Sequence, residues 1–309
     1  MSRSMWSEAM NTTLEEQAFE ASEECLVSIR VTSGDLEVHS WDKAQIAIQS
    51  PDGPAKVHRE GAKFNIAPGG MAGAGDMTVH VPRRCSLNAT VCNGDVTIED
   101  IDGQVNLEAM NGDVEAIGLR GALSVRAFSG DVSILRSALS DLNDELLSGD
   151  CTIESALVGG GKYHLHAFSG DVHLLLPEDQ KCTLSIHSSS GEVDCSLPHE
   201  VKSQRHHDSE IEINGGGVPF RLVADSGDVT VKAAKELPEG YEKEAQPTEP
   251  FDVGVRERQA DSEPFGLGKS PAPEPKSPEL MEILRAVEQG KLTVDEALAK
   301  ISVLESRSR

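Results

Sequence analysis

Residues 93–135 read NGDVTIEDIDGQVNLEAMNGDVEAIGLRGALSVRAFSGDVSIL, and this stretch decides the fold. Its glycines recur every nine residues, at Gly94, Gly103, Gly112, Gly121 and Gly130. Between them, apolar and polar residues alternate in short segments such as Val96-Thr97-Ile98. This alternation is typical of a half-buried strand, and glycine can take the positive φ of a tight corner. Nine residues therefore predict one strand and one turn, and eighteen predict a coil with two long sides.

The same corner signature extends beyond this stretch. A tripeptide with Gly in the middle and Asp or Glu after it recurs, with its glycine at Gly34, Gly75, Gly94, Gly112, Gly130, Gly149, Gly170, Gly191 and Gly227. Most intervals are 18 to 21 residues, but Gly34 to Gly75 spans 41 and Gly191 to Gly227 spans 36. Each long interval is near twice the short ones, so we expect it to hold a coil whose turn signature has been lost or replaced.

Equivalent positions also repeat their chemistry from coil to coil. Two residues before the corner glycine stand Cys92, Met110, Phe128, Leu147 and Phe168, and three before it stand Val91, Ala109, Ala127, Leu146 and Ala167. Such columns are expected where coils stack about 4.8 Å apart and like packs on like. The sequence therefore predicts an all-β fold: a single-chain β-solenoid, or β-helix, with coils of about 18–21 residues and a thin interior of Val, Ile, Leu, Ala and Cys.

The acidic residue after each corner glycine has two interpretations. A ladder of carboxylates could bind Ca²⁺, but the calcium-binding nonapeptide repeats carry Gly-Gly-x-Gly-x-Asp, which this chain lacks. Turn chemistry is favoured, because Asp beside Gly accepts hydrogen bonds from nearby backbone N–H groups. We assign a structural turn role to Gly34, Asp35, Gly94, Asp95, Gly112, Asp113, Gly130, Asp131, Gly149, Asp150, Gly170, Asp171, Gly191, Gly227 and Asp228.

Composition narrows the function classes. The chain has 28 Lys+Arg against 52 Asp+Glu, a net charge of −24, which argues against nucleic acid or an anionic membrane as the main partner. No stretch approaches the roughly 18 apolar residues of a membrane span, and the N-terminus lacks the apolar core of a secretory signal, so we expect a cytoplasmic protein. The six cysteines form no Cys-x-x-Cys pair and are expected to be small buried hydrophobes.

No catalytic constellation stands out. His164 and His166 alternate on one predicted strand and His173 follows, a set that could bind a transition metal, although outward-facing polar residues are the favoured interpretation. The phosphate loop, Gly-x-Ser-x-Gly and His-Glu-x-x-His motifs are missing from the sequence. The serines of the Ser-Gly-Asp turns have no histidine at constant spacing. We therefore expect no enzyme activity, no cofactor and no metal.

The segment LVSIRVTSGDLEV (residues 26–38), then Trp41-Asp42 and the alternating Ile46 and Ile48, resembles the opening of the bacterial putative-adhesin family of β-strand-repeat proteins. Residues 77–82, followed by the Gly-Asp-Val coils, resemble the body of the same family, so the resemblance covers roughly residues 17 to 233. It implies a β-solenoid. It implies no catalytic residues, because the family is defined by its repeats.

Beyond residue 234 the composition changes. Residues 235–280 hold 8 of the 15 prolines and 11 acidic residues, which predicts a disordered linker over 235–276. Ser277 and Pro278 then start a helix that Gly290 ends, and residues 293–296 form a capping box for a second helix. Residues 283–297 resemble the short helical modules of the SHOCT type. The exposed stripe predicted to bind a partner comprises Leu280, Ile283, Leu284, Val287, Leu292, Leu298, Ile301 and Leu304.

The sequence thus divides into an N-terminal cap or disordered segment (1–20), a β-solenoid (21–234), a Pro/Glu-rich linker (235–276) and an αα-hairpin (277–305). We expect a non-enzymatic scaffold or protein-interaction module that recruits a protein partner or a second copy through the hairpin, without binding nucleic acid or inserting into a membrane. Two alternatives remain: a carbohydrate-binding or carbohydrate-cleaving β-helix, and a regulator in a bacterial envelope-stress pathway.

Overall fold

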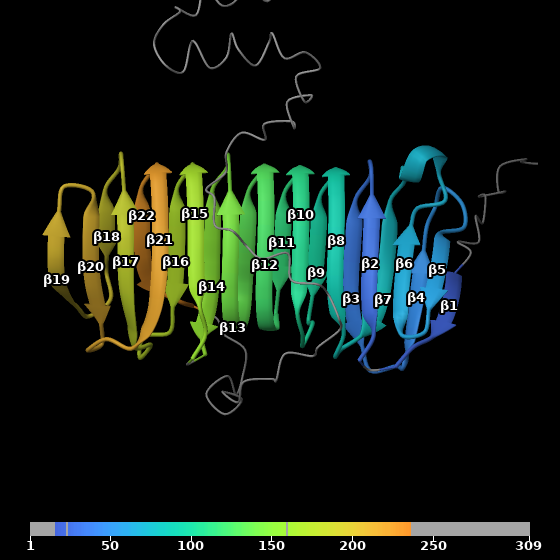
Figure 1. Cartoon of the computed structure of the whole chain (residues 1–309), viewed down its shortest axis with the longest axis horizontal. Coiled ribbons are helices and arrows are strands. Elements are labelled where there is room, and N and C mark those ends of the chain that lie inside the picture. The colour runs from blue at the N-terminus through green and yellow to red at the C-terminus, as the bar shows by residue number, and fades with distance from the viewer. Residues whose placement is uncertain (1–15, 23, 159, 236–309) are drawn as a thin grey trace, which may run out of the picture. The chain divides into compact units, whose positions relative to one another are not determined.

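The computed structural model describes residues 16–22, 24–158 and 160–235, which form strands joined by turns and one 3₁₀ turn, Met71–Gly73 (Figure 1). The strands form one continuous sheet that winds into two faces, face A and face B, whose apolar sides turn toward each other. In spatial order, face A holds β5 (Lys56–Glu60), β6 (Lys63–Ala67), β2 (Leu26–Val31), β8 (Ser86–Asn93), β10 (Val105–Asn111), β12 (Arg120–Ser129), the second half of β13 (Val132–Leu146), β15 (Tyr163–Ser169), β21 (Val218–Ser226), β17 (Cys182–Ser188), β20 (Asp208–Ile213) and β19 (His199–Arg205). Face B holds β1 (Glu16–Glu20), β4 (Gln45–Gln49), β7 (Met77–Pro82), β3 (Leu36–Trp41), β9 (Val96–Glu99), β11 (Val114–Ile117), the first half of β13, β14 (Cys151–Leu157), β16 (Val172–Leu176), β22 (Val229–Ala233) and β18 (Val193–Cys195).

Each coil runs up face A, turns at a glycine corner and returns on face B. In the coil of β10 and β11, Val105 pairs in parallel with Leu123 of the next coil, 18 residues later. Val105 and Leu107 are buried, whereas Asn106 and Glu108 point outward. The prediction of an all-β repeat fold is confirmed for the described residues, and the pairing gives the stacked coils of a solenoid. The predicted hairpin over 277–305 lies outside the described residues.

The interior is thin and mostly aliphatic. The large rings inside it lie toward the ends of the stack: Phe64 on β6, and Tyr163 stacked on Phe220 with centroids 5.8 Å apart. All six cysteines are free thiols, and four of them are buried. Burial raises the pKa of Cys25 to about 11 and that of Cys182 to about 12, so both stay protonated at neutral pH.

The two columns before the corner glycine lie on opposite sides of face A. The column three residues before it, which includes Val91, Ala109 and Ala127, is buried. The column two residues before it points outward: Met110 is 49% exposed, Phe128 44% and Phe168 53%. The columns repeat as expected, but only one of them belongs to the interior.

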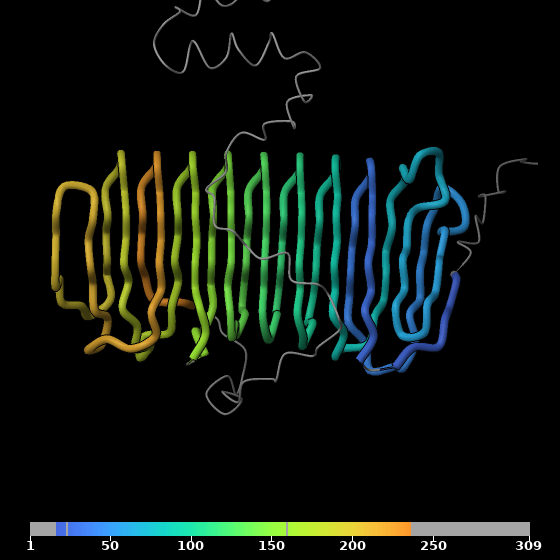
Figure 2. Tube along the Cα trace, in the orientation of Figure 1, coloured from blue at the N-terminus to red at the C-terminus, as the bar shows by residue number. Residues whose placement is uncertain are grey.

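The long intervals do not hold coils that have lost their signature, so that expectation was wrong. Residues 35–74 contain β4 and β5, and residues 192–226 contain β19 and β20, all of which pair antiparallel to their neighbours. The chain makes these strands at an end of the stack and then returns. As a result, the coil of β2 and β3 lies between β6–β7 and β8–β9, and the coil of β21 and β22 lies between β15–β16 and β17–β18 (Figure 2).

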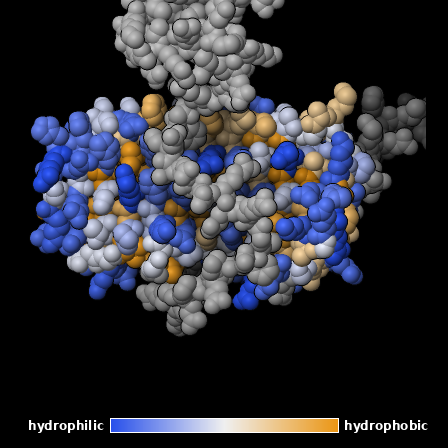
Figure 3. Space-filling view, viewed as in Figure 1, coloured by the Kyte–Doolittle hydropathy of each residue, from blue (hydrophilic) through white to orange (hydrophobic). Residues whose placement is uncertain are grey.

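Both ends of the stack are closed by antiparallel strands rich in charge. On face A the outermost strands are KVHRE (β5) at one end and HEVKSQR (β19) at the other, and nearly all of their side chains are exposed. In Figure 3 hydrophilic residues gather at the end formed by β19 and β20. Charged edge strands of this kind oppose pairing with the edge of another sheet.

One carboxyl group of the described residues lies fully inside the core. Asp144 on β13 is fully buried and pairs in register with Val125 on one side and Leu165 on the other. Its Oδ2 atom accepts a hydrogen bond from the Cys151 thiol at 3.2 Å, while Oδ1 has no partner. Burial, with a smaller contribution from the charge of Glu145, raises the pKa of Asp144 to about 7.

The first prediction concerns the corners. A Cβ added at Gly112, where φ is +130°, would lie 2.1 Å from the Gly94 carbonyl oxygen, whereas one added at Gly53, where φ is +120°, would meet nothing within 4 Å. We expect Gly53→Ala to cost about 1–3 kcal/mol through backbone conformation alone. Gly112→Ala should cost more than about 4 kcal/mol, because backbone must also move. Thermal and urea unfolding measure both, and equal losses would refute the steric role of the corner contact.

The second prediction concerns pH. The folded state keeps the Asp144 proton up to about pH 7, whereas the unfolded chain releases it near its ordinary pKa of 3.8. This contribution to stability is therefore present below about pH 4 and is lost as the pH rises toward 7, by roughly 4 kcal/mol at 1.36 kcal/mol per unit. Urea unfolding from pH 4 to 8 measures it. Asp144→Val, which continues the apolar column, should flatten this part of the profile, and an unchanged slope would contradict the assignment.

Candidate functional site

The glycine corners form one column along the stack. In spatial order it runs Gly75, Gly34, Gly94, Gly112, Gly130, Gly149, Gly170, Gly227 and Gly191, with φ between 124° and 140° throughout. The carboxylate after each glycine accepts the backbone N–H of the equivalent residue in the next coil, at 2.8 to 3.0 Å. The Oδ1 atoms therefore satisfy corner N–H groups, which is the role that turn chemistry assigns to them.

Glu192 is the one member of this ladder that is not aspartate. It lies in the last coil, where its N–H donates to Asp228 Oδ1 at 2.8 Å, and no described residue continues the ladder beyond it. Each inner residue donates its backbone N–H to the coil on one side and accepts an N–H from the coil on the other side through its carboxylate. The aspartate side chain has the length that places its carboxylate at that N–H. The terminal residue only donates, so a glutamate is tolerated there.

Beside the corner lies the outward apolar column found above, hereafter the corner column. It comprises Cys92, Met110, Phe128, Leu147 and Phe168, from five coils that are consecutive in space. Polar residues border it at both ends of the column, with Thr32 next to Cys92 and Asp225 next to Phe168 in the strand register. An exposed apolar strip rimmed by polar groups is typical of a surface that binds a partner.

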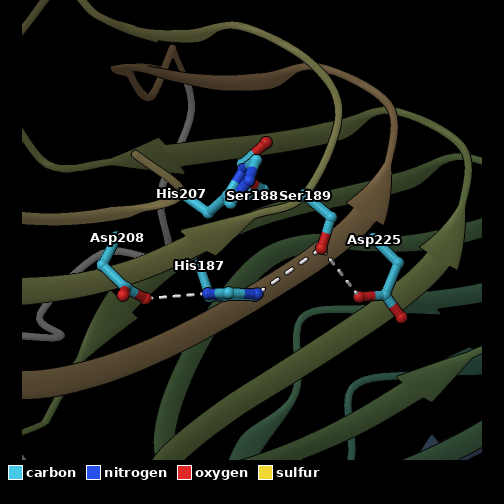
Figure 4. A network of polar contacts seen from close by, with 6 residues as sticks. All are labelled: His187, Ser188, Ser189, His207, Asp208 and Asp225. Carbon is cyan, nitrogen blue, oxygen red and sulfur yellow. Dashed lines mark hydrogen bonds and ion pairs between the residues drawn. The ribbon is translucent and has the colours of Figure 1, made fainter. Parts of the chain in front are cut away.

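A second feature is a polar network on face A near β20. His187 Nδ1 lies 2.7 Å from Asp208 Oδ1, and His187 Nε2 lies 3.4 Å from Ser189 Oγ (Figure 4). Ser189 Oγ also lies 3.5 Å from Asp225 Oδ1, and Asp225 Oδ2 lies 3.3 Å from His166 Nε2. The network thus crosses β20, β17, β21 and β15 and links the antiparallel cap to the last coils.

The order Asp208, His187, Ser189 is that of a nucleophilic triad, but its surroundings differ from those of one. Ser189 is exposed, and the Asp208 side chain is 72% exposed. A second carboxylate, Asp225, lies within reach of the same hydroxyl and would repel an oxyanion formed there. The geometry supports a hydrogen-bonded clamp across four strands better than acyl transfer.

The three histidines considered as metal ligands do not lie on one face of the structure. His164 and His166 point outward from β15 on face A, whereas His173 lies on β16 of face B. Burial lowers the pKa of His164, and the nearby charges of Arg221 and His166 add to this. Within the described residues no group of three or more His, Cys, Asp or Glu side chains is placed to hold a metal ion.

A shallow depression of about 220 Å³ lies on the same face, over β15, β21 and β17. It is lined by Lys162, Tyr163, Ser185, Pro219, Phe220 and Arg221. No sequence motif marks it, because its residues come from three strands that are adjacent only through the displaced order of the last coils. The pairing of His187 with Asp208 could not be predicted for the same reason, because it depends on β20 lying beside β17.

The partner-binding residues proposed from the sequence, Leu280 to Leu304, lie outside the described residues. In the described residues, the candidate binding surface is the corner column. Its apolar residues recur two positions before each corner glycine. Simple alternation could have found it, since neighbouring residues of a strand face opposite sides.

Parallel coils with glycine corners, closed by antiparallel caps, define the chain as a β-coil repeat protein. A family model described as Toastrack DUF4097 matches residues 71–232, more than half of the 309 residues. The chain therefore belongs to this family. Among curated proteins, none matches the chain.

Several solved structures are similar to the chain. A putative cell adhesion protein from Clostridium sporogenes ATCC 15579 is 10% identical, covering 71% of this chain and 99% of its own, with a TM-score of 0.35. A putative adhesin from Bacteroides fragilis NCTC 9343 is 12% identical, covering 72% and 97%, with a TM-score of 0.35. A putative lipid binding protein from Parabacteroides distasonis ATCC 8503 is 9% identical, covering 73% and 96%, with a TM-score of 0.31. In the part of the chain that the structure describes, no helix is long and apolar enough to cross a membrane.

The third prediction separates the two interpretations of the carboxylate ladder. Asp131→Ala removes the acceptor of the Asp150 N–H and should cost about 1 kcal/mol, the usual net value of one hydrogen bond. Glu192→Ala removes a side chain that accepts no corner N–H and should change stability by less than about 0.5 kcal/mol. Thermal unfolding with millimolar Ca²⁺ or with EDTA should give the same Tm. A clear rise with Ca²⁺ would restore the calcium interpretation.

Proposed function

We propose that this protein is a non-enzymatic interaction scaffold whose corner column binds a protein partner. The observation that carries the proposal is the exposure of Met110 and Phe168, at 49% and 53%, on a surface repeated over five coils. At about 4.8 Å per coil the column is roughly 19 Å long. A strip of that length on a rigid stack suits an extended or helical segment of a partner.

The backbone of the column is held rigidly. Its strands pair in register on both sides, and the adjacent corner is fixed by the glycine contacts and the carboxylate ladder. A partner that binds here orders little of the scaffold, so most of the loss in conformational entropy falls on the partner. This favours a flexible apolar segment as the partner rather than a second rigid surface.

The C-terminal segment supplies the second part of the proposal. The predicted stripe from Leu280 to Leu304 would recruit a protein partner or a second copy, in the manner that its resemblance to SHOCT-type modules implies. A tethered second contact raises the effective concentration once the first has formed. The charged end strands oppose assembly of stacks end to end, so we place self-association in this segment. We propose a cytoplasmic location, with no cofactor, no nucleic acid and no membrane insertion.

The fourth prediction tests both parts in the full-length chain. Met110→Asp with Phe168→Asp places two charges in the corner column, and Ile283→Asp with Leu284→Asp places two in the C-terminal stripe. The control is Thr90→Asp with Ser124→Asp, which adds the same charge to outward polar positions of face A. Sedimentation velocity measures self-association, and quantitative affinity capture from the native host measures partners.

We expect the column variant to lose its captured partners at least tenfold while its sedimentation stays unchanged. The C-terminal variant should lose self-association, partner capture or both. If the column variant captures the same proteins as the control, the corner column is not the binding surface. If full-length chain and C-terminal variant agree in both measurements, the segment has no recruiting role.

A further inference from the structure

One edge of face B ends without an antiparallel strand. Face A ends in β5 and β19, and the other edge of face B ends in β1, each antiparallel to its neighbour. The remaining edge of face B is β18, a strand of three residues that pairs only with β22 among the described residues. In Figure 1, β20 and β19 continue the row of face A strands beyond β18, at the left end of the stack. Face A therefore overhangs face B at this end.

The backbone of β18 has hydrogen-bonding groups on its free side. The Val229 N–H donates to the Glu192 carbonyl at 2.8 Å, and the Ser196 N–H donates back to β22 at 2.9 Å. In a parallel pair, alternate residues of one strand bond to the same neighbour. The N–H and C=O groups of Val193 and Cys195 therefore point away from β22, toward the position that a next strand of face B would occupy.

Apolar side chains at this edge are incompletely covered. Val201 on β19 pairs in register with Ile211, so both side chains lie on the core side of face A. Ile211 is 4% exposed, whereas Val201 is 49% exposed, because no described strand of face B lies opposite β19. Val193 and Cys195 pack against the core but are only partly buried. The valines of β22 that are in register with them are fully buried.

A short edge strand is by itself one way in which proteins avoid pairing with other sheets, and charged residues on the core side are another. Here the core side of the edge carries Val193, Cys195 and Val201, which are apolar. A strand added about 4.8 Å from β18 would lie opposite β20 and β19 and would cover these side chains. The edge therefore combines free backbone groups with apolar surface that one more strand would bury.

We propose that the free edge of β18 binds an extended segment of a protein partner, which adds one strand to face B beneath β20 and β19. Apolar residues of the segment face Val201 and the core, and the polar residues between them point outward beside Asp194. Hydrogen bonds to the backbone of Val193 and Cys195 supply affinity, and the alternate side chains supply specificity. The edge lies on the other face from the corner column, so failure of this proposal would leave the function proposed above untouched.

Two other occupants fit this edge less well. The chain leaves β22 in the opposite direction, since the Lys235 N–H donates to Glu154 Oε1 on β14 at 2.9 Å, and β14 lies on the far side of β16. A second copy that extended face B would bring its own face A strands into the space that β19 and β20 occupy. A single extended segment of a partner meets neither obstacle.

The probe is the peptide Asp-Val-Thr-Val-Lys-Ala with blocked ends. It has the sequence of residues 228–233, which include the strand that β18 already pairs with on its other side. The peptide is titrated into the ¹⁵N-labelled full-length protein. We expect the amide signals of Val193, Cys195 and Val201 to shift at millimolar peptide, and hydrogen exchange at Val193 and Cys195 to slow.

Two modified peptides test whether binding uses one edge of the added strand. One carries N-methyl groups on its valines and the other on Thr and Lys, so that each loses the N–H donors of a different edge. One of them should lose binding and the other should keep it, because only one edge of the peptide can face β18. The proposal is overturned if the unmodified peptide shifts no signal, or if both modified peptides bind equally well or equally poorly.

Val201→Lys places a charge on the core side of the overhang and should weaken peptide binding about tenfold, which corresponds to about 1.4 kcal/mol. The matched control is Ser185→Lys, which adds the same charge to an exposed position on the outer side of face A and should leave the affinity unchanged. Thermal unfolding checks that both variants fold. Equal affinity of the two variants for the peptide would contradict the proposed surface.

Hydrogen exchange without peptide distinguishes the other occupants. In the free full-length protein the amides of Val193 and Cys195 should exchange rapidly, while that of Asp194, which bonds to β22, should be protected. Protection of Val193 and Cys195 at every protein concentration would assign the edge to another segment of this chain. Protection that rises with protein concentration would assign it to a second copy. Either result overturns the proposal of a foreign partner.

Discussion

The structure depends on the approach of backbone to backbone at the corner between the two faces. A Cβ at Gly94, Gly112 or Gly130 would lie 2.1 Å from the carbonyl oxygen of the preceding corner glycine, so only glycine fits. This contact sets the spacing of the coils at the corner and brings the strands of both faces into register. Register in turn decides which residues are inside, because a slip of one residue would reverse every side chain. The thin aliphatic interior and the outward corner column are both consequences.

The carboxylate ladder solves a second problem created by the same corner. The N–H after each glycine turns away from its own strand, and the carboxylate of the neighbouring coil accepts it. The ladder has a direction, from Asp76 through Asp35 and Asp95 to Asp228 and Glu192, and this direction follows space rather than sequence. Coils made early and late in the chain can therefore be inserted between others without any change in corner chemistry. That freedom allows the two ends to double back into antiparallel caps.

Much of the fold could be predicted from the sequence, since the coil length, the glycine corners and the alternation are all local patterns. The spatial order of the coils could not be predicted, because the repeat period gives the length of each coil but does not say which coil lies beside it. The glutamate at 192 was a signal of the end of the stack, visible in the sequence but interpretable only with the hydrogen bonds in view. The clamp between His187 and Asp208 needed the pairing of β17 with β20, and the depression at Arg221 needed β21 beside β15. Both arise where the order of coils departs from the order of the chain.

This departure also bears on where function can reside. The regular coils from β8 to β14 offer the same outward pattern repeatedly, and a repeated pattern suits an extended partner along the corner column. The inserted coil of β21 and β22 breaks the repeat, since Asp225 stands where the inner coils carry Met110, Phe128 or Leu147. It also brings Arg221 next to His164, where the charge of Arg221 adds to burial in lowering the pKa of the imidazole. The corner column therefore ends at β15, and a partner that binds the column contacts only the regular coils.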